Sequence, residues 1–156
     1  MIVSLRKFIS IRERCRDCNE KVVFTNGCFD ILHYGHLDYL TKAKKLGDVL
    51  VVGVNTDSSI KKFKPGNRPI IPEKYRAKLV DGLKPVDYVI LFSEKTPQKL
   101  IEKIRPDLLV KGADYKLSEI VGADIVRSYE GKVKRIKLIP GLSTSRILHK
   151  VRKSKD

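Results

Sequence analysis

The chain has 156 residues, of which 42% are hydrophobic, and a formal net charge of +15 at pH 7. This length fits one domain with its own core, and the positive charge attracts partners that carry phosphate groups. No apolar stretch is long enough to cross a bilayer, the N-terminus does not resemble a signal peptide, and three cysteines do not make a disulfide framework. We therefore expect one cytoplasmic domain over residues 1–156, with residues 1–20 as an N-terminal helical extension.

Helical and strand patterns alternate along the chain. In the first half we expect a helix over 5–14, a strand over 21–25, a helix over 34–46, a strand over 48–54, a basic loop over 55–67 with up to one helical turn, and a helix over 72–83. In the second half we expect a strand over 88–92, a helix over 97–104 capped by Thr96, a strand over 108–111, a helix over 117–129 with Gly122 as a candidate interruption, a strand over 132–139, and a helix from Ser143 to about 150. This alternation predicts an α/β fold with five parallel strands in right-handed βαβ units.

Polar loops follow four of the five predicted strands. They are residues 26–36 after the first strand, 55–57 after the second, 111–115 after the fourth and 141–145 after the fifth. Ligands of parallel α/β sheets bind beyond the carboxyl ends of the strands. The four loops therefore predict one ligand site at this edge of the sheet.

Two histidines lie where the first strand passes into a helix. His33 and His36 are three residues apart, and Gly27 and Gly35 let the backbone approach a ligand closely because neither carries a Cβ atom. The N-terminus of a helix offers free N–H groups and a positive dipole end to an anion. We expect a phosphate chain to contact both imidazoles there.

Further hydroxyl and basic groups suit a phosphate ligand. Ser143, Thr144 and Ser145 open the last helix behind a glycine, which makes a phosphate cradle as well as an ordinary N-cap. The loop after the second strand carries three lysines (Lys61, Lys62, Lys64), of which one is expected to neutralise charge in the transition state. Such a run of lysines is also typical of a solvated face. The fork of Arg76 can grip a phosphate with two hydrogen bonds, or its side chain can simply snorkel to the surface.

Two other interpretations remain open. A basic nucleic-acid-binding module explains the net charge, and a Lys-rich surface of a heat-adapted protein explains it without a ligand. A zinc protein would use Cys15, Cys18, Cys28 and the two histidines, but the second pair that completes a zinc finger is absent. We expect neither a nucleic-acid partner nor a metal held by the protein.

Residues 26–36 resemble the His-x-Gly-His signature of the cytidylyltransferase-like nucleotidyltransferases, and Gly141–Ser145 is similar to the second motif of that superfamily. The likeness extends from about Lys21 to the last helix. It implies a Rossmann-like three-layer sandwich and an enzyme that transfers a nucleotidyl group to a phosphorylated acceptor. It also implies Mg²⁺, held by phosphate oxygens and water.

Three segments (residues 23–30, 96–100 and 106–115) look most like the nucleotidyltransferase domain of ADP-heptose synthases. That likeness implies transfer of AMP from ATP to D-glycero-β-D-manno-heptose 1-phosphate for the lipopolysaccharide inner core. It also implies a homodimer, in a stand-alone form that depends on a separate heptose kinase. Glycerol-3-phosphate cytidylyltransferase, which uses CTP, and FAD synthase are similar too. Residues 138–141 depart from the Arg-Thr-Glu-Gly stretch of the former, which weakens that alternative.

The predicted site combines these motifs and the resemblance. We expect His33, His36 and Lys64 to be catalytic. The nucleotide and its phosphates are expected to contact Asn26, Gly27, Cys28, Phe29, Gly35, Lys61, Lys62, Arg76, Lys111, Gly112, Asp114, Ser143, Thr144 and Ser145. The acceptor is expected to contact Asp30, Asn55, Asp57 and Tyr115.

Overall fold

A five-stranded parallel sheet organises the structure, which is a computed structural model that describes residues 1–154. The last two residues of the expected 1–156 domain lie outside the described residues. The strand order is β3-β2-β1-β4-β5, with bounds β1 (Val22–Gly27), β2 (Val49–Asn55), β3 (Tyr88–Phe92), β4 (Leu108–Gly112) and β5 (Lys132–Ile136). The predicted Rossmann-like α/β fold is therefore confirmed.

Helices cover both faces of this sheet, which makes three layers. On one face, α1 (Leu5–Asp17), α5 (Gln98–Ile104) and α6 (Ala123–Ser128) share a buried cluster with Phe24. On the other face, α2 (Tyr34–Lys44) and α4 (Glu73–Asp81) share a cluster with Val23. Successive side chains of a strand point to opposite faces, so a strand covered on both sides is apolar throughout. This is why β2 is buried at every position.

The N-terminal segment is part of this architecture. Ile2 forms a parallel bridge with Val89 beside the edge strand β3, and the N–H of Val3 donates to the carbonyl of Val89 at 2.9 Å. The first helix buries Phe8 completely in the core cluster. Residues 1–20, expected as a helical extension, thus add to both the sheet edge and the core. None of the helices within residues 1–154 is long and apolar enough to cross a membrane.

Some element boundaries differ from the predictions. Strand β5 ends at Ile136, because the last residue of β4, Gly112, pairs with Ile136 and leaves no partner for residues 137–139. The expected helix over 117–129 divides into η1 (Leu117–Glu119) and α6, with Gly122 between them at φ +86°, a left-handed conformation that favours glycine. The predicted Thr96 cap is wrong, since Pro97 occupies the N-cap of α5 without a side-chain bond.

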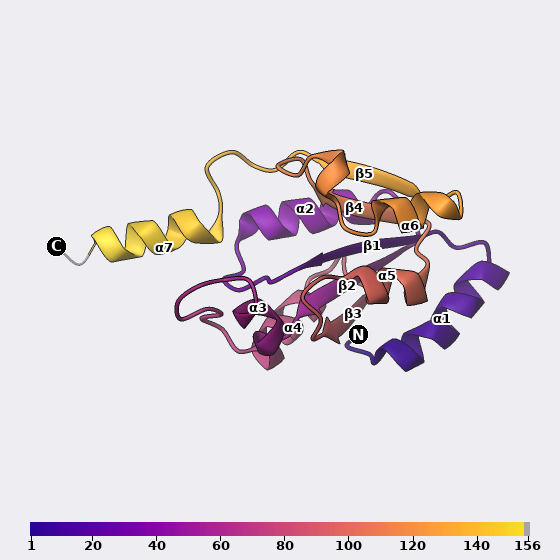
Figure 1. Ribbon diagram of the computed structural model, residues 1–156, viewed down its shortest axis with the longest axis horizontal. Coiled ribbons are helices and arrows are strands. Elements are labelled where there is room, and N and C mark those ends of the chain that lie inside the picture. The colour runs from indigo at the N-terminus through magenta and orange to yellow at the C-terminus, as the bar shows by residue number, and fades with distance from the viewer. Residues whose placement is uncertain (155–156) are drawn as a thin grey trace.

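Two short helices border the edge of the sheet where the predicted loops gather. The expected helical turn in the basic loop is α3 (Asp57–Lys61), and Thr56 caps it. The last helix, α7 (Thr144–Lys153), begins at the predicted N-cap Ser143, whose hydroxyl accepts the N–H of Arg146 at 3.3 Å. Figure 1 shows α7 extending away from the layers, at the end of the sheet opposite α1. None of the residues of α7 is buried.

Candidate active site

Two adjoining cavities open where the strands end. We call the one of about 330 Å³ the α5-side cavity and the one of about 340 Å³ the α7-side cavity. Both are lined by Asn26, Gly27, Cys28, Phe29, His36, Lys64, Lys111, Tyr115 and Thr144. The α5-side cavity adds Asp30, Asn55, Phe63, Arg68, Lys95, Thr96, Pro97, Glu119, Ile120 and Val121. The α7-side cavity adds His33, Gly35, Tyr39, Gly112, Asp114, Leu138, Ile139, Leu142, Ser143 and Ser145. The expected convergence of the four loops is thus present.

The two histidines stack on each other at the start of α2. His33 is the N-cap, and the two ring centroids are 4.0 Å apart with planes inclined by 26°. The backbone N–H of His33 donates to Nδ1 of His36 at 3.4 Å. Since Nδ1 of His36 is the acceptor, the proton of its neutral ring belongs on Nε2. His36 therefore has an N–H group to offer to a ligand in the cavities.

Both imidazoles are uncharged at neutral pH. Burial lowers the pKa of His36 to about 4, and repulsion from a protonated His33 and from Lys64 adds to this effect. Burial also lowers the pKa of His33. A phosphate ligand would bring negative charge to this place and favour the protonated rings.

This shift predicts how stability depends on pH. Unfolded His36 takes up a proton near its ordinary pKa of 6.5, whereas folded His36 does so only near 4. Its contribution to stability is therefore complete above pH 6.5 and is lost as the pH falls toward 4, by on the order of 3 kcal/mol. Urea unfolding at pH 7 and pH 4.5 should show a larger loss for the wild-type protein than for His36→Asn. Equal losses in the two proteins would contradict the assigned shift.

The loop before the histidines has an unusual shape. Phe29 lies at φ +48°, a left-handed conformation that costs a residue with a side chain roughly 1 kcal/mol or more. Its ring lies close to Gly27, because a Cβ atom at that position would be only 3.1 Å from the ring. The same ring lies 5.2 Å from the ring of His36. Glycine at position 27 thus leaves room for Phe29 to pack against His36.

Gly35 is required beside the first histidine. A Cβ atom at this position would lie 3.0 Å from the ring of His33, closer than ordinary packing allows. We expect Gly35→Ala to displace that ring by a few tenths of an ångström and to lower turnover on the order of tenfold. Turnover and the unfolding midpoint should be compared with those of Gly82→Ala, since the nearest atom to a Cβ at Gly82 is 3.5 Å away. Equal turnover in the two variants would refute the role of Gly35.

Lys111 brings a cation to the centre of the site. Its Nζ donates to the carbonyl of Asn26 at 3.3 Å and also to the side-chain oxygen of Asn26. Burial lowers the pKa of Lys111 to about 8, against the opposing influence of Cys28 and Asp114. The ammonium group is therefore still mostly charged at neutral pH, and it ties the end of β4 to the end of β1.

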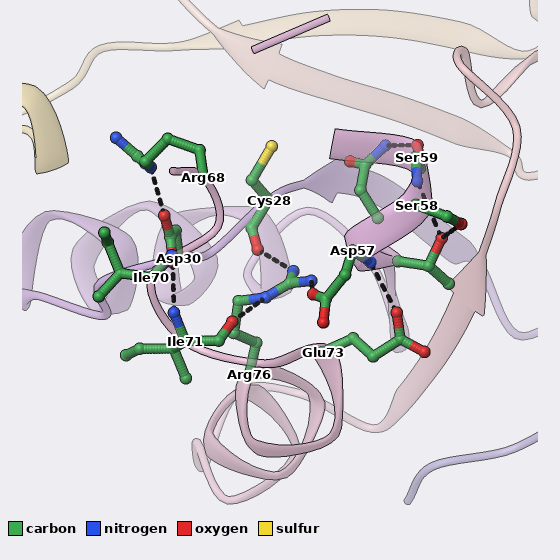
Figure 2. A network of polar contacts seen from close by, with 12 residues as sticks. Cys28, Asp30, Asp57, Ser58, Ser59, Arg68, Ile70, Ile71, Glu73 and Arg76 are labelled. Atoms are coloured by element: carbon green, nitrogen blue, oxygen red, sulfur yellow. Dashed lines mark hydrogen bonds and ion pairs between the residues drawn. The ribbon is translucent and has the colours of Figure 1, made fainter. Parts of the chain in front are cut away.

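Asp30 holds the basic loop in place. Figure 2 shows its carboxylate accepting hydrogen bonds from Nε of Arg68 at 2.5 Å and from the N–H groups of Ile70 and Ile71 at 2.8 and 2.9 Å. Although Asp30 lines the α5-side cavity, only 2% of the residue is exposed. This geometry corrects the prediction that Asp30 contacts the acceptor, because its oxygens already serve the chain itself.

Arg76 and Asp57 belong to the same network. The fully buried guanidinium of Arg76 donates to the carbonyl of Ile71 at 2.8 Å, to the carbonyl of Cys28, and to Asp57 at 2.6 Å (Figure 2). Neither residue lines a cavity. The predicted phosphate contact of Arg76 and substrate contact of Asp57 are therefore corrected: both residues hold loops together.

Only one of the three candidate lysines reaches the site. Lys64 lines both cavities. Lys62 instead donates to the carbonyl of Ser93 at 2.9 Å, and Lys61 is exposed on α3. Neither lines a cavity, which corrects the prediction that these two contact phosphates. The network of Asp30 and Arg76 fixes the loop from which Lys64 extends.

Comparison with known proteins bears on this arrangement of histidines, lysines and hydroxyl groups. Residues 24–150 match the family model described as Cytidylyltransferase-like. The chain belongs to the cytidylyltransferase-like family. This agrees with the family resemblance of the histidine motif.

Relatives within this family are similar over most of the chain. The bifunctional protein HldE of Citrifermentans bemidjiense is 51% identical over 140 residues, which cover 90% of this chain and 28% of the relative. That of Helicobacter pylori is 49% identical over 153 residues, which cover 98% and 32%. The chain thus spans about a third of the length of the curated relatives that it matches.

Solved structures agree with this assignment. The lipopolysaccharide core biosynthesis protein from Thermoplasma volcanium is 36% identical, with a TM-score of 0.62, and the match covers 77% of this chain and 97% of that protein. A pantothenate synthetase from Thermus thermophilus has a TM-score of 0.65 at 17% identity, over 98% of this chain and 70% of that one, which is a likeness of fold alone.

This cytidylyltransferase-like site also contains residues that the sequence analysis missed. Arg68, Lys95, Thr96 and Glu119 line the α5-side cavity. Lys95 and Thr96 follow β3, the one strand whose following loop was left aside. Ligands bind beyond the carboxyl ends of parallel strands, and applying this rule to the loop after β3 would have identified Lys95 and Thr96.

The alternative zinc site finds no support among the residues that the structure describes. Within residues 1–154, no three His, Cys, Asp or Glu side chains gather as a metal site would require. Cys15 is a buried residue of α1 and Cys18 is exposed at its C-cap, whereas His33 and His36 lie at the start of α2. The cysteine pair and the histidines are therefore separate features.

Proposed function

We propose that the chain transfers AMP from ATP to heptose 1-phosphate and releases pyrophosphate. The observation that carries the reaction is the stacked pair of neutral histidines at the start of α2, between two cavities that share Lys64, Lys111 and Thr144. The choice of heptose phosphate rests on the relatives named HldE and on the lipopolysaccharide core biosynthesis protein. These proteins support the assignment through their similarity to most of this chain.

In the proposed reaction, a phosphate oxygen of the acceptor attacks the α-phosphorus of ATP. A new P–O bond forms, the bond from the α-phosphorus to the bridging oxygen breaks, and that oxygen leaves with pyrophosphate. No covalent intermediate with the protein is needed, so the residues act by positioning the substrates and neutralising charge. Nε2–H of His36 donates to phosphate oxygens, and Lys64 adds positive charge.

The start of α7 would hold the far phosphates. Ser143 and Thr144 stand at a helix N-terminus, where free N–H groups favour an anion. Mg²⁺ would enter with the nucleotide and offset the phosphate charge. The carboxylates of Asp30 and Asp57 are already bonded within the chain, which fits a metal held chiefly by phosphate oxygens and water.

We also propose an oligomeric state, a location and a source of the acceptor for this enzyme. The resemblance supports a homodimer in the cytoplasm that receives its acceptor from a heptose kinase. Size-exclusion chromatography with light scattering tests the dimer directly, and a monomer at micromolar concentration would contradict it.

Pyrophosphate release tests the proposed activity. ATP and CTP, each with Mg²⁺, should be crossed against heptose 1-phosphate, glycerol 3-phosphate and FMN. We expect release only with ATP and heptose 1-phosphate. Release with another pair would show that the chain uses different substrates in the same class of reaction. If no pair reacts, a salt titration with DNA or RNA should follow, because a nucleic-acid-binding module shows steeply salt-dependent affinity.

A further inference from the structure

The residues that line only one of the two cavities have different chemical properties on the two sides. The α7-side cavity has the hydroxyls of Ser143 and Ser145 at a helix N-terminus, next to the apolar side chains of Leu138 and Leu142. Free N–H groups and hydroxyls suit phosphates, and an apolar wall suits a flat base. This side therefore fits a nucleoside triphosphate.

The α5-side cavity has a wall suited to a hydroxyl-rich molecule. It carries the carboxylate of Glu119, the hydroxyl of Thr96 and the ammonium of Lys95. The buried amide of Asn55 lies at its edge and donates to the hydroxyl of Ser59 at 2.9 Å. These groups accept or donate hydrogen bonds in several directions, as the hydroxyl groups of a sugar require. The cations Lys64 and Arg68 line the same cavity and suit the phosphate of such a molecule.

Glu119 is exposed and is held only by contacts with Lys116. Its carboxylate makes only long contacts with Lys116, at 3.4 Å to the backbone N–H and 3.9 Å to Nζ, and 57% of the side chain is exposed. The residue after it, Ile120, is 4% exposed and anchors η1 in the core cluster. The carboxylate of Glu119 is thus held by its contacts with Lys116 and keeps further lone pairs that can accept hydrogen bonds from a ligand.

The charge of Glu119 determines how an acceptor lies in this cavity. A carboxylate repels a phosphate but accepts strong hydrogen bonds from hydroxyl groups. The phosphate end must therefore face Lys64 and His36, where the nucleotide is also in reach, and the hydroxyl end must face Glu119. This orientation brings the attacking oxygen to the wall that the two cavities share.

We propose that the α5-side cavity binds the sugar phosphate acceptor and that Glu119 selects it by accepting hydrogen bonds from its sugar hydroxyls. This inference rests on the proposed function, since it takes the acceptor to be a phosphorylated sugar. Glu119 acts as a specificity residue: it contacts the part of the acceptor that does not react.

Steady-state kinetics of Glu119→Ala test the inference. We expect the KM for heptose 1-phosphate to rise about tenfold to a hundredfold, the size of a lost hydrogen bond to a charged group. The KM for ATP and the affinity for ATP by titration calorimetry should stay within twofold. The matched control is Glu13→Ala, an exposed residue of α1 at the opposite end of the sheet, which should change neither KM.

Several results would overturn the inference. One is an unchanged KM for the acceptor in Glu119→Ala, and another is an equal increase in the KM values for the acceptor and for ATP. Glu119→Gln keeps the size of the side chain and should raise only the acceptor KM, which guards against misfolding of the alanine variant. If the wild-type protein ignores heptose 1-phosphate, the proposed function fails. The KM of the acceptor that it does use, measured in Glu119→Ala, then decides the role of the cavity.

Discussion

Replacing His36 by alanine is expected to lower the rate of pyrophosphate release about 100- to 1000-fold, while the protein stays folded. The neutral ring lies stacked on His33, with its Nε2–H available to phosphate oxygens in both cavities. Loss of one donor aimed at charge that develops in a transition state has an effect of this size. The rate at saturating substrates is the quantity to measure, together with the circular dichroism spectrum.

His149 provides a matched control for this experiment. It is an exposed histidine of α7 and lines neither cavity, so His149→Ala should keep wild-type turnover. Turnover of His36→Ala within threefold of the wild type would refute the proposed mechanism. A loss of the folded spectrum would instead assign His36 to stability, and His36→Gln would then separate the two roles.

Replacing Arg76 by methionine is expected to lower the free energy of unfolding by about 3–5 kcal/mol. The guanidinium is fully buried and bonds to two backbone carbonyls and to Asp57. Methionine fills a similar space but leaves these acceptors without donors, and breaking a buried ion pair by removing one partner has a cost of this size. The unfolding midpoint should fall on the order of 10 °C.

Lys78 is the control for Arg76, because it is an exposed cation on the same helix. Lys78→Met should change the free energy of unfolding by less than about 0.5 kcal/mol. Arg76→Lys keeps the charge but lacks the planar fork, so its stability should fall between those of the wild type and the methionine variant. A stability of Arg76→Met equal to that of Lys78→Met would refute the structural role of this network.

The fold could be predicted because its signals are local. The continuous apolar run of β2 indicates a strand buried on both faces, and the alternation with helices then leaves few topologies. The predicted ends of helices and strands were wrong where a neighbouring element, and not the local sequence, determines them. Nothing within residues 132–139 tells that β5 ends at Ile136, because the limit comes from the length of its neighbour β4.

Some residues of the site could likewise be predicted from the sequence, and others could not. His33, His36 and Ser143 were predicted because their positions at helix N-termini follow from the sequence pattern. Asp30, Asp57 and Arg76 were assigned to ligands because a charged residue in a ligand-facing loop has the same sequence signal whether it binds a substrate or another loop. Only the three-dimensional partners, such as the carbonyl of Cys28 for Arg76, distinguish the two roles.

The separate walls of the two cavities have an evolutionary consequence. One wall comes from loops after β2, β3 and β4, and the other chiefly from the segment that joins β5 to α7. Apart from the loop after β4, which lines both cavities, these walls come from different segments of the chain, so a substitution in one need not alter the other or the shared His36. If the proposed function holds, a descendant of this chain can acquire a new acceptor by single substitutions in one wall, without first losing the nucleotide or the chemistry.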